Sequence, residues 1–185
     1  MNEVDATDWL VKAIRDARII CAKRLAYPEL GGDDGRPDGL HLPGNLILDL
    51  APELRLRGGN DRTAPVALVG AFGDTNAGVL VWHGLGSGKD SQGRARLHDL
   101  SGVASPLRDP ENSGALAVLA FERSRRGIQC DYVVCRTIKE EDQIEDRLGP
   151  VDPGYAVIWG AHAARVSADD RLPRWLPLEM PADEW

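Results

Sequence analysis

Glycine and proline divide this chain into short segments. The sequence has 20 glycines and 12 prolines among 185 residues, about one residue in six. Because both residues interrupt regular structure, the chain has many positions for turns and little room for long helices. Its apolar stretches are short and rich in β-branched residues, as in 65–72 (PVALVGAF) and 78–83 (GVLVWH). This pattern favours a fold built mainly from short strands.

The segments predict about six or seven strands and two or three helices. Strand-like or buried apolar segments occur at 19–25, 40–42, 65–72, 78–83, 115–121, 131–137 and 155–159, and helical patterns at 7–17 and 139–148. Residues 46–50 fit either a helical turn or a strand. The strands do not alternate regularly with helices, which argues against a doubly wound parallel sheet. We therefore expect a mainly β (α+β) fold, a mostly antiparallel barrel or sandwich with flanking helices.

The composition is typical of one globular domain, with 43% apolar and 28% charged residues. No apolar run is long enough to span a membrane, and the acidic start lacks the apolar core of a signal peptide, so we expect no membrane partner. The three cysteines have no CxxC spacing, which indicates reduced thiols and a cytoplasmic protein. We expect one domain at 1–168 and a C-terminal extension or severed linker at 169–185.

Familiar catalytic motifs do not occur in the sequence. Residues 84–90 (GLGSGKD) look like a phosphate loop, but that motif requires glycine in place of His83 and serine or threonine in place of Asp90. No D/E-x-K sequence occurs, so a nuclease metal site is not indicated. The histidines are widely separated, and no serine lies in a GxSxG turn. The sequence therefore predicts no catalytic residues, no metal ligands and no cofactor for binding.

Two long glycine-rich loops carry contrasting charges. The loop at 84–98 has one acid, Asp90, and its basic and polar residues are Lys89, Arg94, Arg96, His98, Ser91 and Gln92. It is a candidate surface for phosphates and bases, although the whole chain has a formal net charge of −7. The loop at 26–39 is acidic, with Arg36 among Glu29, Asp33, Asp34 and Asp38. A carboxylate there could accept a hydrogen bond from the N4 amino group of cytosine. For both loops, a solvated segment without a ligand remains the alternative.

One long run of the sequence resembles a known family. Residues 105–116 (SPLRDPENSGAL), continuing to Leu119, Ala120 and Phe121, are similar to the N-terminal effector domain of EcoRII-type restriction endonucleases. Shorter similar pieces follow the same order, at Trp9–Leu10, Lys23–Leu25, Gly39–Pro43, Gly88–Lys89, Glu140–Asp142 and Ile144–Glu145. The resemblance covers residues 7–160.

The resemblance implies both a fold and a function. The fold would be a B3-like DNA-binding pseudobarrel, an open barrel of about seven strands with short helices. Two arms, here 23–41 and 84–98, would grip the major groove of double-stranded DNA from opposite sides, at a CCWGG-like target. The domain would be the non-catalytic, allosteric effector of a bacterial type II enzyme. The nuclease domain of the parent chain would lie C-terminal to it, and Mg²⁺ would serve only that domain.

The resemblance also assigns DNA-contacting positions. Lys23, Arg24 and Lys89 match family contact residues, whereas Arg36 and His41 occupy contact positions that hold other residue types in the family. The remaining candidates are assigned by their place in the arms: Asp38, Ser91, Gln92, Arg94, Arg96 and His98. Two other functions stay open, a small metal-dependent nuclease with an unrecognised site and a barrel interaction module without affinity for DNA.

Overall fold

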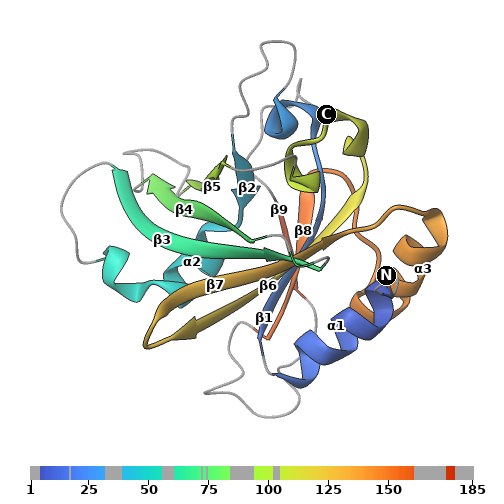
Figure 1. The fold of residues 1–185 in the computed structure, drawn as a ribbon, viewed down its shortest axis with the longest axis horizontal. Helices are drawn as coiled ribbons and strands as arrows, with labels where there is room; N and C mark the ends of the chain where they lie inside the picture. The colour runs from blue at the N-terminus through green and yellow to red at the C-terminus, as the bar shows by residue number, and fades with distance from the viewer. Residues whose placement is uncertain are drawn as a thin grey trace.

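The computed structural model describes residues 5–16, 18–31, 39–55, 61–71, 73, 75–83, 94–101, 105–160 and 174–177. Within these ranges, one sheet of nine strands is accompanied by three α-helices and four short 3-10 helices (Figure 1). None of these helices is both long and apolar enough to cross a membrane.

The strands and helices occur in the following ranges. The strands are β1 (Ile19–Arg24), β2 (Leu40–Leu42), β3 (Asp61–Gly70), β4 (Thr75–His83), β5 (Arg94–Ser101), β6 (Leu116–Ser124), β7 (Gly127–Val134), β8 (Tyr155–Trp159) and β9 (Arg174–Pro177). The α-helices are α1 (Ala6–Arg15), α2 (Gly44–Leu50) and α3 (Ile138–Leu148). The 3-10 helices are η1 (Tyr27–Leu30), η2 (Pro52–Arg55), η3 (Pro106–Arg108) and η4 (Pro110–Asn112).

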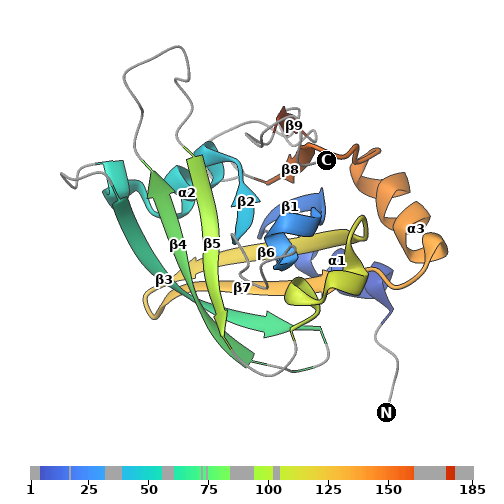
Figure 2. The same cartoon turned by 90° about the horizontal axis from the view of Figure 1, so that it is seen from above.

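The strands form a single curved sheet in the order β2-β5-β4-β3-β7-β6-β1-β8-β9. Neighbouring strands are antiparallel, except that β3 and β7 pair in parallel. Figure 2 shows the sheet bending round, so that β3, β4 and β5 lie on one side and β1, β6 and β7 on the other. The predicted mainly β, barrel-like fold is therefore confirmed, with nine strands in place of about seven.

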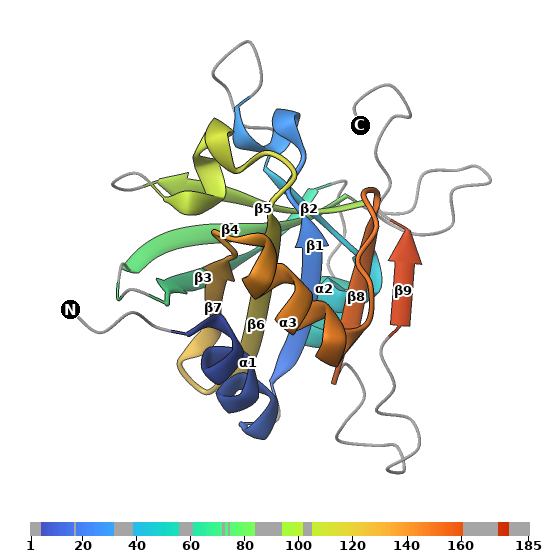
Figure 3. The same cartoon turned by 90° about the vertical axis from the view of Figure 1, so that its right-hand side faces the viewer.

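Two apolar cores lie on the two faces of this sheet. The barrel interior is filled from one end by α2, whose Leu46, Ile47 and Leu50 are buried among the inward side chains of the strands. On the outer face, α1 and α3 pack over β1, β6 and β8 (Figure 3). The two faces follow the alternation of each strand. In β1, for example, Cys21 faces the barrel interior, whereas Ile20 and Ala22 face the helices.

Several elements differ from the sequence-based expectation. Residues 44–50 form a helix, which settles the ambiguous segment. Strand β5 begins at Arg94, so Arg94, Arg96 and His98 lie on a strand and not in the predicted loop. Residues 174–177, within the predicted extension, form an edge strand that pairs with β8. Helix α1 begins at Ala6, one residue before the predicted helical pattern at 7–17, because Asp5 caps it and accepts a hydrogen bond from the Thr7 amide.

Candidate nucleic-acid interface

The roots of the two predicted arms lie on neighbouring strands. The first arm leads into β2, and the second connects β4 to β5 by way of the paired residues His83 and Arg94. Strands β2 and β5 then pair directly, with His41 opposite Arg96. Arms that are far apart in the sequence therefore start from one short ladder.

The arms leave this ladder at opposite ends, because β2 and β5 are antiparallel. At one end, Gly39 lies against His98, and a β-carbon added at Gly39 would come within 2.9 Å of the His98 ring. Gly39 also has a φ of +83°, which favours glycine at this point. At the other end, Arg94 begins β5. The four-residue step from Arg94 to His98 spans roughly 13 Å at the usual rise of a strand.

The base of the first arm contains a buried ion pair. Lys23, on β1, and Glu29, in η1, are both fully buried and bonded to each other. The Glu29 carboxylate also accepts hydrogen bonds from the backbone amides of Ala26 (2.9 Å) and His41 (2.7 Å). Burial alone raises the pKa of Glu29. The charge of Lys23 and hydrogen bonds with the His41 side chain, the Ala26 amide and Lys23 outweigh it and lower the pKa to about 2. Glu29 is therefore an anion that holds both ends of the loop.

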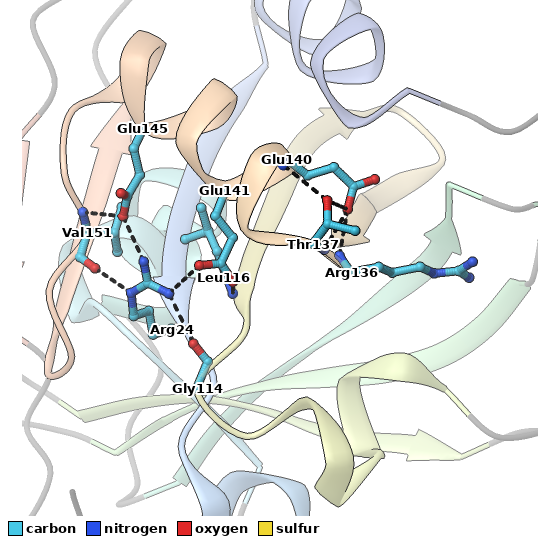
Figure 4. A network of polar contacts seen from close by, with 9 residues as sticks. All are labelled: Arg24, Gly114, Leu116, Arg136, Thr137, Glu140, Glu141, Glu145 and Val151. Atoms are coloured by element: carbon cyan, nitrogen blue, oxygen red, sulfur yellow. Dashed lines mark hydrogen bonds and ion pairs between the residues drawn. The ribbon is translucent and has the colours of Figure 1, made fainter.

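The neighbouring residue, Arg24, points to the other face of the sheet (Figure 4). Its guanidinium pairs with Glu141 at 2.7 Å and Glu145 at 3.0 Å, both on α3. It also donates hydrogen bonds to the carbonyls of Val151 (2.8 Å) and Gly114 (3.1 Å). Burial lowers the pKa of Arg24, yet the bonds to the two glutamates raise it overall. Arg24 therefore ties α3 to the barrel.

The predicted contact residues fall into three groups. Arg36, Asp38, Lys89, Ser91 and Gln92 lie outside the described residues. The second group is brought together on the β2–β5 ladder, with Arg96 and His98 half-buried and His41 only 3% exposed; Arg94 begins the same strand. The third group departs from the prediction: Lys23 has no exposed surface, and Arg24 is held by α3. In this conformation the positions of Lys23 and Arg24 argue against direct contact with DNA.

Comparison with known proteins places this arrangement in a family. The family model for "Restriction endonuclease EcoRII, N-terminal" matches residues 14–163, which include both arm roots. This chain belongs to the EcoRII N-terminal family. A curated relative, the type II restriction enzyme EcoRII of Escherichia coli, is 28% identical over 156 residues. That alignment covers 81% of this chain and 38% of the relative, so the chain spans well under half of the relative's length.

The run 105–116, which carries the resemblance to the EcoRII N-terminal family, forms a connector held in place by hydrogen bonds. Ser105 caps η3 and its hydroxyl lies 3.2 Å from that of Tyr132, while the Asn112 side chain donates to the Pro106 carbonyl at 2.8 Å. The amide of Gly114 then bonds to the carbonyl of Leu25, at 2.8 Å. Because η3 and η4 contact η1, this run supports the base of the first arm.

The structural roles of three glutamates in this EcoRII-family domain, Glu29, Glu141 and Glu145, were missed by sequence reasoning. Strand alternation contained a usable signal, because Lys23 is in phase with the inward-facing Cys21 and Leu25. A lysine on an inward face requires an acidic partner, and Glu29 provides it. The partners of Arg24 are Glu141 and Glu145 on α3, more than 110 residues away in sequence. No local sequence pattern predicts these pairings.

The described part of this EcoRII-family domain contains no group of three or more His, Cys, Asp or Glu side chains that could hold a metal ion. The cysteines are buried and unpaired, with Cys130 facing the barrel interior and Cys135 the outer core. Burial raises the pKa of Cys21 and of Cys135 to about 12, so both thiols are neutral near pH 7.

Proposed function

We propose that this domain recognises a specific sequence in double-stranded DNA by placing its two arms in the major groove. The observation that carries the proposal is the position of the arm roots at opposite ends of the β2–β5 ladder. Their separation along the strand, roughly 13 Å, is close to the major-groove width of about 12 Å. The two arms can therefore enter one groove from its two sides.

The second arm supplies the positive charge for this interaction. We assign phosphate and guanine contacts to Lys89, Arg94 and Arg96, since arginine binds the O6 and N7 atoms of guanine with two hydrogen bonds. In the first arm, Arg36 would contact the backbone and Asp38 would accept from cytosine N4. The half-buried His98 and the largely buried His41 form the floor between the arms.

The domain would act as the non-catalytic effector of an EcoRII-like type II restriction endonuclease with a CCWGG-like target. Membership of the EcoRII N-terminal family supports this role. Because the chain covers only 38% of the relative's length, the nuclease would be a separate C-terminal domain of the parent chain. Mg²⁺ would be needed there and not for DNA binding.

Selection from a library of random duplexes tests the proposal directly. The selected duplex should bind at least about 10³-fold more tightly than a scrambled duplex, and both affinities should fall as salt is raised. Equal affinity for the two duplexes would refute sequence-specific recognition. Absence of a gel shift even at low salt would favour an interaction module without DNA affinity.

Incubation of the bound duplex with Mg²⁺ tests the non-catalytic assignment. The duplex should remain intact. Cleavage that persists through a second purification, and that increases in proportion to protein concentration, would show instead a small nuclease with an unrecognised metal site.

Arginine substitutions test which surface contacts DNA. Arg94→Ala and Arg96→Ala should each weaken binding to the selected duplex by about 1–3 kcal/mol if they contact guanine. The matched controls are Arg125→Ala and Arg126→Ala, in the exposed turn between β6 and β7, which should have little effect. Equal losses from both pairs would contradict the assignment of the second arm.

A further inference from the structure

Strand β2 lies at one end of the sheet order and has β5 as its strand neighbour. In an antiparallel ladder, the amide and carbonyl of a given residue point to the same side. At His41 both groups point away from β5: its amide donates to Glu29 at 2.7 Å, and its carbonyl accepts from Lys23 at 3.2 Å. The two charged side chains thus occupy the place of the next strand along the edge.

The two partners of His41 come from the other side of the barrel opening. Lys23 is on β1, and Glu29 is in η1, which follows β1 directly. Glu29 also accepts from the Ala26 amide, and its Oε1 lies 3.3 Å from Nδ1 of His41. We call the pair, with these hydrogen bonds, the Lys23–Glu29 bridge. The bridge joins the two ends of segment 30–40 in the first arm, because Glu29 precedes this segment and His41 follows it.

Stability alone gives a weak reason for such a bridge. Removing two charges from water costs several kcal/mol per ion, and well-packed apolar residues in the same place are often at least as stabilising. An apolar pair, however, could not bond to the amide and carbonyl of His41. The ion pair therefore adds a fixed geometry between β1 and β2. Because the first arm runs between these two strands, this geometry sets where the arm starts and ends.

We propose that Lys23 and Glu29 are positioning residues for DNA recognition, which close the barrel edge between β1 and β2 and fix the first arm without contacting DNA. This inference rests on the proposed function, because it concerns how the first arm is held for sequence recognition.

The test replaces both charges with side chains of similar size, in the double variant Lys23→Met with Glu29→Gln. Affinity for the selected duplex should fall roughly tenfold to a hundredfold, the discrimination normally supplied by one base pair or slightly more. Affinity for scrambled DNA should stay unchanged. The matched control is Arg24→Met with Glu141→Gln, which removes an ion pair of the adjacent residue and should leave the ratio of the two affinities unchanged.

Salt dependence separates positioning from direct contact. Loss of a phosphate contact lowers the slope of log K against log salt by about one. For the Lys23→Met, Glu29→Gln variant, the slope on scrambled DNA should equal that of the wild type. A slope reduced by about one would overturn the proposal and restore Lys23 as a phosphate contact.

Hydrogen exchange tests the bridge independently of DNA. The amides of Ala26 and His41 should exchange faster in the double variant, while those of Leu40 and Leu42, which face β5, should change less. Unchanged exchange at Ala26 and His41 would refute the bridge. If the wild type shows no sequence preference, the proposed function fails, yet this measurement still decides whether the bridge exists. If the double variant does not fold, Glu29→Asp serves, because it keeps an anion for Lys23 but shortens the side chain that reaches the two amides. It should speed exchange at Ala26 and His41 and lower specific affinity less.

Discussion

Lys23 and Arg24 are adjacent cations at the end of β1, yet they have opposite environments. Lys23 faces the barrel interior, is fully buried and has one acidic partner, Glu29, besides the nearby His41. Arg24 faces α3, keeps 22% of its side chain exposed and pairs with two glutamates. A strand that turns alternate residues to opposite faces produces this difference from a single basic dipeptide.

The comparison shows how the same charge can take two structural roles. Lys23 and Glu29 have no exposed surface, so each charged group depends entirely on its partners in the protein. Around Arg24 the remaining glutamate and solvent can compensate for the loss of one partner. The first unit, Lys23 with Glu29, should therefore be sensitive to single substitutions. The second unit, Arg24 with Glu141 and Glu145, should tolerate them.

The largest expected effect is that of Glu29→Ala. The substitution leaves the Lys23 ammonium buried without an anion and two backbone amides without an acceptor, so the free energy of unfolding should fall by about 3–5 kcal/mol. Urea unfolding measures it. Glu141→Ala is the matched control and should cost only about 1–2 kcal/mol, since Arg24 keeps Glu145 and the Leu116 amide loses one acceptor. Equal losses would mean that burial does not distinguish the two units.

Acid should separate the two units in a second way. The pKa of Glu29 is lowered from 4.5 to about 2 in the folded protein. The unfolded chain therefore takes up this proton first, and the contribution of Glu29 is complete above pH 4.5 and lost as the pH falls towards 2. The loss amounts to about 3 kcal/mol.

The variant Lys23→Met with Glu29→Gln lacks this titration and gives the reference curve. Its free energy of unfolding, followed over the same acidic range, should fall less steeply than that of the wild type. Parallel curves for the two proteins would contradict the low pKa of Glu29.

Local sequence patterns anticipated much of the fold but not its closure. The strands β1, β2, β4 and β8 follow from short apolar runs between glycine and proline. Helix α2 stayed ambiguous because the letters LILDL fit both periods, and only packing selects the helical set Leu46, Ile47 and Leu50. The parallel pairing of β3 with β7 depends on the whole topology, so no local pattern contains it.

For a related reason, the sequence alone placed the residues of the candidate interface only in part. The basic residues at 94, 96 and 98 favour the prediction of a loop. The structure shows a strand, in which the alternating Ala95 and Leu97 are buried. The resemblance predicts where the arms lie, and the structure adds that the strands flanking the predicted arms share one ladder. The positive charge of Lys23 suggests a contact with DNA, but strand alternation turns its side chain towards the barrel interior.

A smaller effect is expected from Arg24→Ala. The substitution removes four bonds from the guanidinium to α3 and to two backbone carbonyls, but the glutamates left behind can reach water. The free energy of unfolding should fall by about 1–2 kcal/mol. Specific binding relative to scrambled DNA should stay at the wild-type value, as measured by competition gel shift. A lost preference would show that Arg24 contacts DNA or positions an arm after all.

The smallest expected effect concerns the start of α3. Thr137 accepts a hydrogen bond from the Glu140 amide at 3.3 Å, and the Glu140 carboxylate accepts from the Thr137 amide at 3.0 Å, which forms a capping box (Figure 4). Thr137→Ala removes one half of the box and should cost about 0.5–1 kcal/mol, while Thr137→Ser should restore most of it. Amide exchange should accelerate in the first turn of α3 and stay unchanged near Val151, where Arg24 still holds the chain. Acceleration throughout α3 would mean that the cap, and not Arg24, anchors this helix, and would remove the basis for treating Arg24 as its tether to the barrel.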